Sequence, residues 1–156
     1  MTTRSTVHDS FSIDRHYDAT PARVFKAFAD PAAKAMWFGG PPTTKSEDVS
    51  FDFREGGRET VVTVLDDGNR IGYYATYCDI VPDERIVYTY EMTMGGQRIS
   101  VSVASVEIRQ GAGGGADLRI TEHGIYLDGL DKAELRRQGT DDLLTALGNS
   151  LTQAPE

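Results

Sequence analysis

The chain has 156 residues, of which 39% are hydrophobic and 26% are charged, a composition that fits one globular domain with a real core. Its formal net charge of −8 argues against nucleic acids and anionic membranes as partners, because phosphate groups are bound by clustered Lys and Arg. A single cysteine, Cys78, rules out an internal disulfide, and no apolar run approaches the roughly 18 residues of a membrane span. Residues 1–10 lack the apolar segment of a signal peptide, so we expect a cytoplasmic protein.

The first predicted element is a strand over about residues 9–18. Phe11, Ile13 and Tyr17 alternate there with polar residues, which is the pattern of a strand with one buried face. Arg15 falls on the apolar side of this alternation, so we expect it near an edge of the sheet or beside a partner. We interpret residues 1–8 as a flexible N-terminus and residues 9–153 as a single domain.

Two short helices are predicted directly after this strand. Thr20 is suited to cap the first helix and Pro21 to occupy its first position. Asp30 and Pro31 then end that helix and start a second one, which we expect to run to Phe38. Because almost no residues separate the two helices, they should meet at a sharp angle.

The middle of the chain reads as a succession of strands separated by turn signals. The predicted strands are Val49–Phe53, Glu59–Leu65, Ile71–Val81, Arg85–Met94, Arg98–Arg109 and Asp117–Tyr126. Short connections between neighbours favour an antiparallel meander. With the helices at either end, the pattern predicts an α+β domain.

One face of this meander should be apolar and covered. The apolar phase of the predicted strand Arg98–Arg109 slips after Val103, and a bulge near Ala104-Ser105 would explain the slip and bend the sheet. The residues expected to face inward are Val49, Phe51, Phe53, Ile86, Tyr88, Tyr90, Met92, Ile99, Val101, Val103, Leu118 and Ile120.

The last element is an amphipathic helix that begins at about Thr140. Its apolar stripe is formed by leucines at helical spacing, namely Leu143, Leu144, Leu147 and Leu151. Asp141 and Asp142 fit the first turn of the helix, where acidic side chains are stabilised by the unpaired backbone N–H groups. If the helix extends further back, Arg136 falls near the stripe, so either the helix breaks at Gly139 or Arg136 reaches the interior.

Five motifs in this order resemble the family of homologues of the activator of the heat-shock-protein-90 ATPase. They are residues 15–31 (RHYDATPARVFKAFADP), residues 37–39 (WFG), residues 53–58 (FREGGR), residues 81–90 (VPDERIVYTY) and the closing leucine-rich helix. The resemblance covers about Phe11 to Leu151. It implies the START-like (SRPBCC) helix-grip fold, a curved antiparallel sheet of six to seven strands around a long C-terminal helix, with a cavity between them.

One position departs from the family pattern. Many members have Gly-Trp at the start of the last helix, where this chain has Gly139-Thr140. The loss of the indole should leave more space, or a more polar wall, at one end of the groove.

The sequence offers no clear catalytic constellation. His8, His16 and His123 are scattered and Cys78, which we expect to be a small buried hydrophobe, has no CxxC partner, so no metal site and no cofactor are expected. No Gly-x-Ser-x-Gly elbow is present. The glycine-rich segment Gly111–Gly115 joins two predicted strands, which favours a flexible hairpin over a phosphate-binding loop.

The candidate ligand-binding residues are those expected to face the cavity. They are Trp37, Phe51, Phe53, Tyr77, Tyr88, Tyr90, Met92, Val101, Glu122, Arg136, Thr140 and Leu144. The position of Trp37 suits a residue that fills the core of the small helices as well as one at the mouth of a pocket. Tyr88 and Tyr90 suit residues that pack against the sheet as well as residues that line a pocket. We predict that Glu122 and Arg136 are neighbours that make one end of the pocket polar.

Three functions fit these observations. The first is a binding domain for a small apolar molecule, without chemistry of its own. The second is an enzyme of the polyketide-cyclase or aromatase kind that uses Glu122, Arg136, His123 or a tyrosine. The third is a chaperone-associated protein-interaction domain, which the resemblance implies, and the chain could act as a monomer or a homodimer. A cavity of roughly 300 Å³ or more would favour the first function over the third.

Overall fold

The computed structural model describes residues 3–39 and 44–153. It contains one open antiparallel sheet whose seven strands follow the order β1-β7-β6-β5-β4-β3-β2. The strands are β1 (Thr6–Tyr17), β2 (Lys45–Phe51), β3 (Arg58–Val64), β4 (Arg70–Val81), β5 (Arg85–Met94), β6 (Gln97–Gln110) and β7 (Ala116–Leu127). Helices α1 (Pro21–Ala29) and α2 (Pro31–Ala35) follow β1, and α3 (Ala133–Gln153) closes the chain. This is the predicted helix-grip α+β fold.

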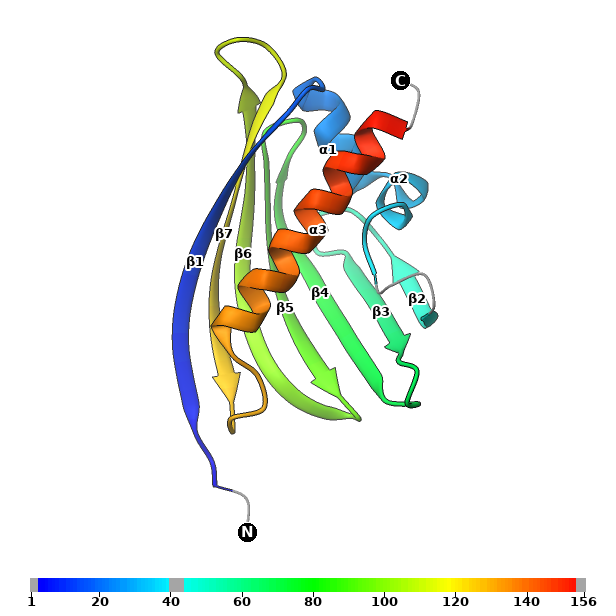
Figure 1. Ribbon diagram of the computed structural model, residues 1–156, viewed down its shortest axis with the longest axis vertical. Helices are drawn as coiled ribbons and strands as arrows, with labels where there is room; N and C mark the ends of the chain where they lie inside the picture. Colours follow the sequence, from blue (N-terminus) through cyan, green and yellow to red (C-terminus); the bar gives the residue numbers. More distant parts are fainter. Residues whose placement is uncertain (1–2, 40–43, 154–156) are drawn as a thin grey trace.

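The sheet curves around α3, which crosses it diagonally, and α1 and α2 lie on the same side beside the C-terminal half of α3 (Figure 1). We call the face that carries the helices the concave face and the opposite face the convex face. None of the helices in the described ranges is both long and apolar enough to span a membrane.

The predicted caps of the two short helices are confirmed. The Thr20 side chain accepts a hydrogen bond from the backbone N–H of Arg23 (3.2 Å), and the Asp30 carboxylate accepts one from that of Ala33 (2.9 Å). Asp30 therefore ends α1 and starts α2 at once. The second helix is shorter than predicted, because α2 ends at Ala35 and does not reach Phe38.

Most strand predictions are confirmed, with small differences at the ends. The bounds of β5 are those predicted, and the glycine-rich segment joins β6 to β7 as a hairpin. β1 begins at Thr6, earlier than the predicted residue 9, and pairs with β7 from Thr6 onward. Just before it, the Ser5 backbone N–H and the Arg4 guanidinium both donate to the Asp128 carboxylate at 2.9 Å, which holds this end of the chain against the β7–α3 connection.

The predicted orientation of part of β6 is wrong. Val101 and Val103 are 39% and 42% exposed on the convex face, while Ser100 and Ser102 face inward. The register shift in β6 lies at Ile99, between the pairs Met92–Ser100 and Thr93–Arg98, and not near Ala104-Ser105. A bulge at Ile99 puts Val101 and Val103 on the opposite face from the one expected, whereas Val106 and Ile108, later in the strand, are buried. Val101 is therefore not a cavity residue.

Two further side chains of the middle strands lie elsewhere than predicted. Val49 is 61% exposed because a second register shift interrupts β2 between Glu47 and Ser50. Cys78 is exposed and not a buried hydrophobe, because it is the extra residue where the β4–β5 register shifts. An extra strand residue is left outside the regular alternation of faces.

The final helix is longer and more continuous than the leucine stripe alone predicts. Gly139 does not interrupt α3, so Asp141 and Asp142 lie inside the helix and not in its first turn. Asp141 instead forms an ion pair with Arg15, and Asp142 accepts a hydrogen bond from Gln138 (3.0 Å). Arg15 thus has a partner, and its strand β1 is also an edge strand.

The C-terminal half of α3 forms the core with the sheet. Leu144, Leu147 and Leu151 are buried, and the Tyr17 hydroxyl donates a hydrogen bond to the carbonyl oxygen of Leu144 (2.7 Å). Burial raises the pKa of Tyr17 to about 12, so this hydroxyl stays neutral and continues to donate.

We predict that Leu147→Ala lowers the free energy of unfolding by about 2–5 kcal/mol, because Leu147 is fully buried and its truncation leaves a cavity. Leu135→Ala in the same helix is the matched control, since Leu135 is 63% exposed and its truncation should change stability by no more than about 0.5 kcal/mol. Urea denaturation measures both values. Equal losses in the two variants would show that the leucine stripe does not carry the packing of α3.

Candidate functional site

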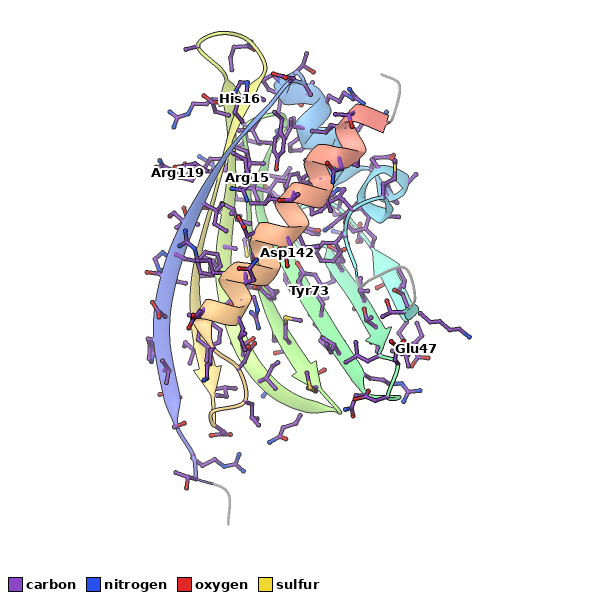
Figure 2. All side chains as sticks on the ribbon, viewed as in Figure 1. Arg15, His16, Glu47, Tyr73, Arg119 and Asp142 are labelled. Carbon is purple, nitrogen blue, oxygen red and sulfur yellow. The ribbon has the colours of Figure 1, made fainter. Side chains whose placement is uncertain are left out.

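A chain of aromatic rings covers the concave face between α2 and the start of α3. The ring centroids are 5.1 Å apart for Phe38–Tyr73, 5.1 Å for Tyr73–Tyr90, 6.0 Å for Tyr88–Tyr90 and 6.1 Å for Tyr77–Tyr88. Tyr73, Tyr88 and Phe38 are only half-buried. In Figure 2, Tyr73 lies in the space beside α3. We call these five residues the aromatic wall.

A buried ion pair lies at one end of the aromatic wall. The Lys34 ammonium of α2 donates to Glu59 Oε1 of β3 (2.6 Å) and to the Tyr77 hydroxyl (3.3 Å), and that hydroxyl donates to the same carboxylate oxygen (2.6 Å). Lys34 and Glu59 are 7% and 3% exposed, and the ammonium lies 4.4 Å from the ring centroid of Phe38. Burial lowers the pKa of Lys34, although Glu59 opposes this effect.

A second buried charged cluster lies at the other end of the wall. The Arg136 guanidinium donates to the Tyr90 hydroxyl (3.0 Å) and to Ser100 Oγ (2.9 Å), and it forms an ion pair with Asp131. The Tyr90 hydroxyl in turn donates to Glu122 Oε1 (2.7 Å). Glu122 is 2% exposed, so this carboxylate depends on Tyr90 and Arg136 for its stabilisation.

The predicted proximity of Glu122 and Arg136 is confirmed. Arg136 Nη1 lies 3.9 Å from Glu122 Oε2, and the guanidinium lies 5.5 Å and 5.6 Å from the ring centroids of Tyr90 and Tyr126. Burial raises the pKa of Glu122, the Tyr90 hydrogen bond and Arg136 oppose the rise, and Asp131 adds to it. One guanidinium therefore serves two carboxylates in a place with little water.

The space enclosed beside the wall is small. A cavity of about 30 Å³ is lined by Phe28, Lys34, Trp37, Phe38, Phe53, Tyr73, Tyr77, Ile86 and Tyr88. This volume has room for about one water molecule, far below the roughly 300 Å³ of a typical ligand site. The concave face therefore presents a partly exposed aromatic surface and not a chamber that encloses a ligand.

A larger concavity of about 590 Å³ lies on the other side of the sheet, over β1, β6 and β7. Its floor is a ladder of alternating charges, in which Asp14 binds Arg119 (2.7 Å) and Arg119 pairs in register with Glu107, which pairs with Arg85. Figure 2 shows Arg119 on the outer side of β1 and Arg15 on the side of α3. Each of these charges lies opposite a charge of the other sign on the neighbouring strand. The surface is therefore stable in water without a bound ligand.

With this geometry established, comparisons with known proteins define the family. Residues 18–153 match the family described as activator of Hsp90 ATPase homolog 1-like protein. The chain belongs to this family. No curated protein has detectable similarity to the sequence.

Solved structures of similar proteins agree with the family assignment. An uncharacterised protein from Rhizobium leguminosarum is 39% identical, with a TM-score of 0.92 over 98% of this chain and 100% of that one. The Mll3558 protein from Rhizobium loti is 40% identical, with a TM-score of 0.86 over 94% of this chain and 99% of that one. An AHSA1-like protein from Aeromonas hydrophila shares the fold at 16% identity, with a TM-score of 0.70 over 93% of each chain.

The structure places most of the predicted residues of this AHSA1-like chain on the concave side, in three groups. Trp37, Phe53, Tyr77 and Tyr88 line the small cavity, and Phe51 packs against the rings of Phe53 and Tyr77. Tyr90, Glu122 and Arg136 form the second cluster. Met92 is half-buried, whereas Thr140 and Leu144 are buried in α3.

Trp37 is both a core residue and a cavity residue. It is 8% exposed, its indole N–H donates to the Ala27 carbonyl (2.9 Å), and its ring packs edge-on against Phe28 and Phe38. Trp37 therefore has both predicted roles, because its ring packs in the core beside α1 and α2 and also lines the cavity.

The ion pair of Lys34 and Glu59 was not predicted from the sequence. Lys34 lies in a five-residue helix, which is too short to show a periodic pattern, and Glu59 begins a strand where charged residues are normally exposed. The clearest available signal is that Glu59 would share a face with Phe51, its neighbour in the β2–β3 register.

The three histidines do not join either cluster. His123 is exposed, in the alternate phase of β7 from Glu122, and His16 binds Asp117 (2.7 Å) on the same side as the charge ladder. Among residues 3–39 and 44–153, no group of three or more His, Cys, Asp or Glu side chains is arranged to hold a metal ion.

We predict that Lys34→Met lowers the free energy of unfolding by about 3–5 kcal/mol, because it leaves the buried Glu59 carboxylate without its cation. The double variant Lys34→Met/Glu59→Gln should recover most of this loss, since the amide carries no charge and its oxygen still accepts from Tyr77. A double-mutant cycle by urea denaturation measures the coupling. Additive losses would mean that the two groups do not act as a pair.

The Glu122→Gln variant should change how stability depends on pH. The folded state favours protonated Glu122, so the stability from this group is present below its usual pKa of 4.5 and is lost as pH rises through the raised pKa. Glutamine cannot ionise, so the free energy of unfolding of the variant relative to wild type should increase with pH.

Urea denaturation at a series of pH values from about 4 to 8 measures this difference. Glu134→Gln, which removes an exposed carboxylate from α3, is the control and should follow the wild-type pH profile. A constant difference between Glu122→Gln and wild type across the series would contradict the prediction.

Proposed function

We propose that this AHSA1-like chain is a binding domain for a small, mostly apolar molecule that lies against the aromatic wall on the concave face. The observation that carries the proposal is the wall itself, whose residues Phe38, Tyr73 and Tyr88 are only half-buried between two buried charged clusters. An apolar surface with a few fixed polar groups is the usual composition of a small-molecule site.

The buried charges support a functional reading of this face. A buried ion pair gains little stability over apolar side chains of similar size, because both charges lose their water. The Lys34–Glu59 pair and the Glu122–Arg136 pair therefore give the fold little net stability that apolar side chains could not give, although losing one partner of either pair would be costly. Perturbed titratable groups beside an accessible surface are more typical of binding and catalytic sites.

The size of the cavity limits how a ligand can bind. About 30 Å³ cannot contain more than a small group, so most of the ligand would lie on the half-buried rings outside the cavity. Its polar end would then reach the cluster around Glu122 and Arg136, where α3 approaches β5, β6 and β7.

The cyclase-like alternative has less support. Of its four proposed proton carriers, His123 is exposed and lies in the opposite phase of β7 from Glu122. Burial raises the pKa values of Tyr88 and Tyr90 above their usual range, so both phenols stay protonated and neither releases its proton readily. Binding without turnover is therefore the better proposal.

Two observations favour a second candidate, a protein-interaction domain. The first is the small size of the cavity beside the aromatic wall, about 30 Å³, which fits a domain that acts through its outer surface. The convex face also exposes Val101 and Val103, at 39% and 42%, on neighbouring positions of β6. The family description, activator of Hsp90 ATPase homolog 1-like, suggests a chaperone as such a partner.

Native mass spectrometry of gently purified protein separates the two candidates. We expect a small molecule that remains bound under native conditions and leaves on denaturation. Returned to stripped protein, it should change the fluorescence of Trp37, the only tryptophan, which lines the cavity.

Tyr88→Ala should weaken this binding at least tenfold, and Val101→Ala, on the convex face, should leave it unchanged. Circular dichroism checks that both variants fold. A protein that retains no small molecule, and whose Trp37 fluorescence responds to none of a panel of apolar compounds, would contradict ligand binding and leave the interaction role.

A further inference from the structure

Three buried polar atoms of the described residues have no hydrogen-bond partner, and all three lie together. They are Ser102 Oγ of β6, and Glu122 Oε2 and Tyr126 Oη of β7. Ser102 pairs in register with Gly124, and Glu122 and Tyr126 flank Gly124 on the same face of the strand. We call these three residues the polar trio.

Gly124 brings the members of the trio together. A Cβ atom at this position would lie 2.8 Å from Tyr126 Oη and 2.9–3.0 Å from two ring carbons. The Tyr126 ring therefore folds back over the bare backbone of Gly124, and its hydroxyl points toward the level of Ser102 and Glu122. Any larger residue at position 124 would push the hydroxyl away.

Burial makes the unpaired state of these atoms costly. Ser102, Glu122 and Tyr126 are 3%, 2% and 1% exposed, so bulk water does not satisfy them. Buried polar groups without partners are few in native proteins, and each one is destabilising. Three of them at adjacent positions indicate a shared partner that is not part of the chain.

The charges around the trio restrict what that partner can be. Arg136 donates to Tyr90 and Ser100 and pairs with Asp131, and its 3.9 Å distance to Glu122 Oε2 is too long for a hydrogen bond. Two carboxyl groups, Glu122 and Asp131, lie beside this one guanidinium. The cluster therefore has no excess positive charge to attract an anionic ligand, and a carboxylate would meet repulsion.

A neutral hydroxyl group matches the trio. Its proton can be donated to Glu122 Oε2, and its oxygen can accept from Ser102 Oγ or Tyr126 Oη. The neighbouring ring of Tyr90, whose hydroxyl binds Glu122 Oε1, continues into the aromatic wall. A molecule with one hydroxyl and an apolar body could thus fill both parts of the site.

We propose that the polar trio is a subsite for a single neutral hydroxyl group of the ligand, occupied by water when no ligand is bound. The proposal rests on the proposed binding function and adds the chemistry of the bound group. It assigns Ser102, Glu122 and Tyr126 as specificity-determining residues that favour alcohols over carboxylates.

Three probes of nearly equal size test the subsite: benzyl alcohol, toluene and benzoate. Titration at pH 7, followed by amide NMR shifts, gives the three dissociation constants. We expect benzyl alcohol to bind about tenfold more tightly than toluene, as one buried hydrogen bond would give. Benzoate should bind more weakly than the alcohol, and the amides of Ser102 and Gly124 should shift with the alcohol.

Variants that delete single hydroxyls separate binding from folding. Tyr126→Phe and Ser102→Ala should bring the dissociation constant of benzyl alcohol close to that of toluene, without a loss of melting temperature, because each removes an unpaired polar group. Tyr17→Phe is the matched control. The Tyr17 hydroxyl is paired with the Leu144 carbonyl, so its removal should lower the melting temperature but leave alcohol binding unchanged.

Other results overturn the subsite. Equal binding of benzyl alcohol and toluene would remove the role of the hydroxyl, and tightest binding of benzoate would refute a site for a neutral group. If none of the three probes binds while a co-purified molecule is retained, the subsite is wrong but the proposed function stands. If no molecule is retained either, both fail.

Discussion

The Arg136 guanidinium is the interaction on which the arrangement of helix and sheet around the site depends. It bonds Tyr90 of β5, Ser100 of β6 and Asp131 in the connection before α3. The C-terminal half of α3 is held by buried leucines, but upstream of Thr140 no comparable stripe exists. Arg136 therefore replaces apolar packing in the first turns of the helix, and its direction fixes where the polar end of the concave face lies.

This replacement has an energetic consequence. A buried charged cluster is well ordered only while each of its members is paired, because a single loss leaves another charge without water or partner. Apolar packing tolerates small changes in volume more readily. The start of α3 is thus specified sharply by a few hydrogen bonds, whereas its end is held by many weak contacts. A ligand that binds near Arg136 meets groups whose positions are already fixed.

Much of the fold followed from local patterns in the sequence. The alternation in β5, the caps at Thr20 and Asp30 and the leucine stripe each rest on neighbours within a few residues, and each was confirmed. Even the Glu122–Arg136 contact could be predicted, because strand phase and helix phase pointed both side chains inward.

The wrong predictions arose where a single extra residue in a strand changes the face of the sheet on which the following side chains lie. A bulge at Ile99 turned Val101 and Val103 outward, and an extra residue in β4 exposed Cys78. No residue type at these positions signals a bulge. The pairing of Lys34 with Glu59 was missed for another reason, since it depends on how α2 lies over the sheet and not on any local period. The volume of the cavity could not be predicted either, because the packing of the rings decides it, and at about 30 Å³ it is far below the roughly 300 Å³ of a typical ligand site.

The small volume alters the physical basis of recognition on this fold. A ligand enclosed in a large chamber gains its affinity mainly from apolar area removed from water. On a wall of half-buried rings that area is limited, so a larger share of the discrimination must come from a few directed hydrogen bonds. The unpaired atoms at Ser102, Glu122 and Tyr126 are the groups on this face that still have bonds to offer. In the absence of a ligand the proposed water satisfies them, and a ligand that displaces this water gains affinity only if its own polar group makes the same bonds. Selectivity in this chain would therefore depend less on the shape of the cavity than on which polar group satisfies these three atoms.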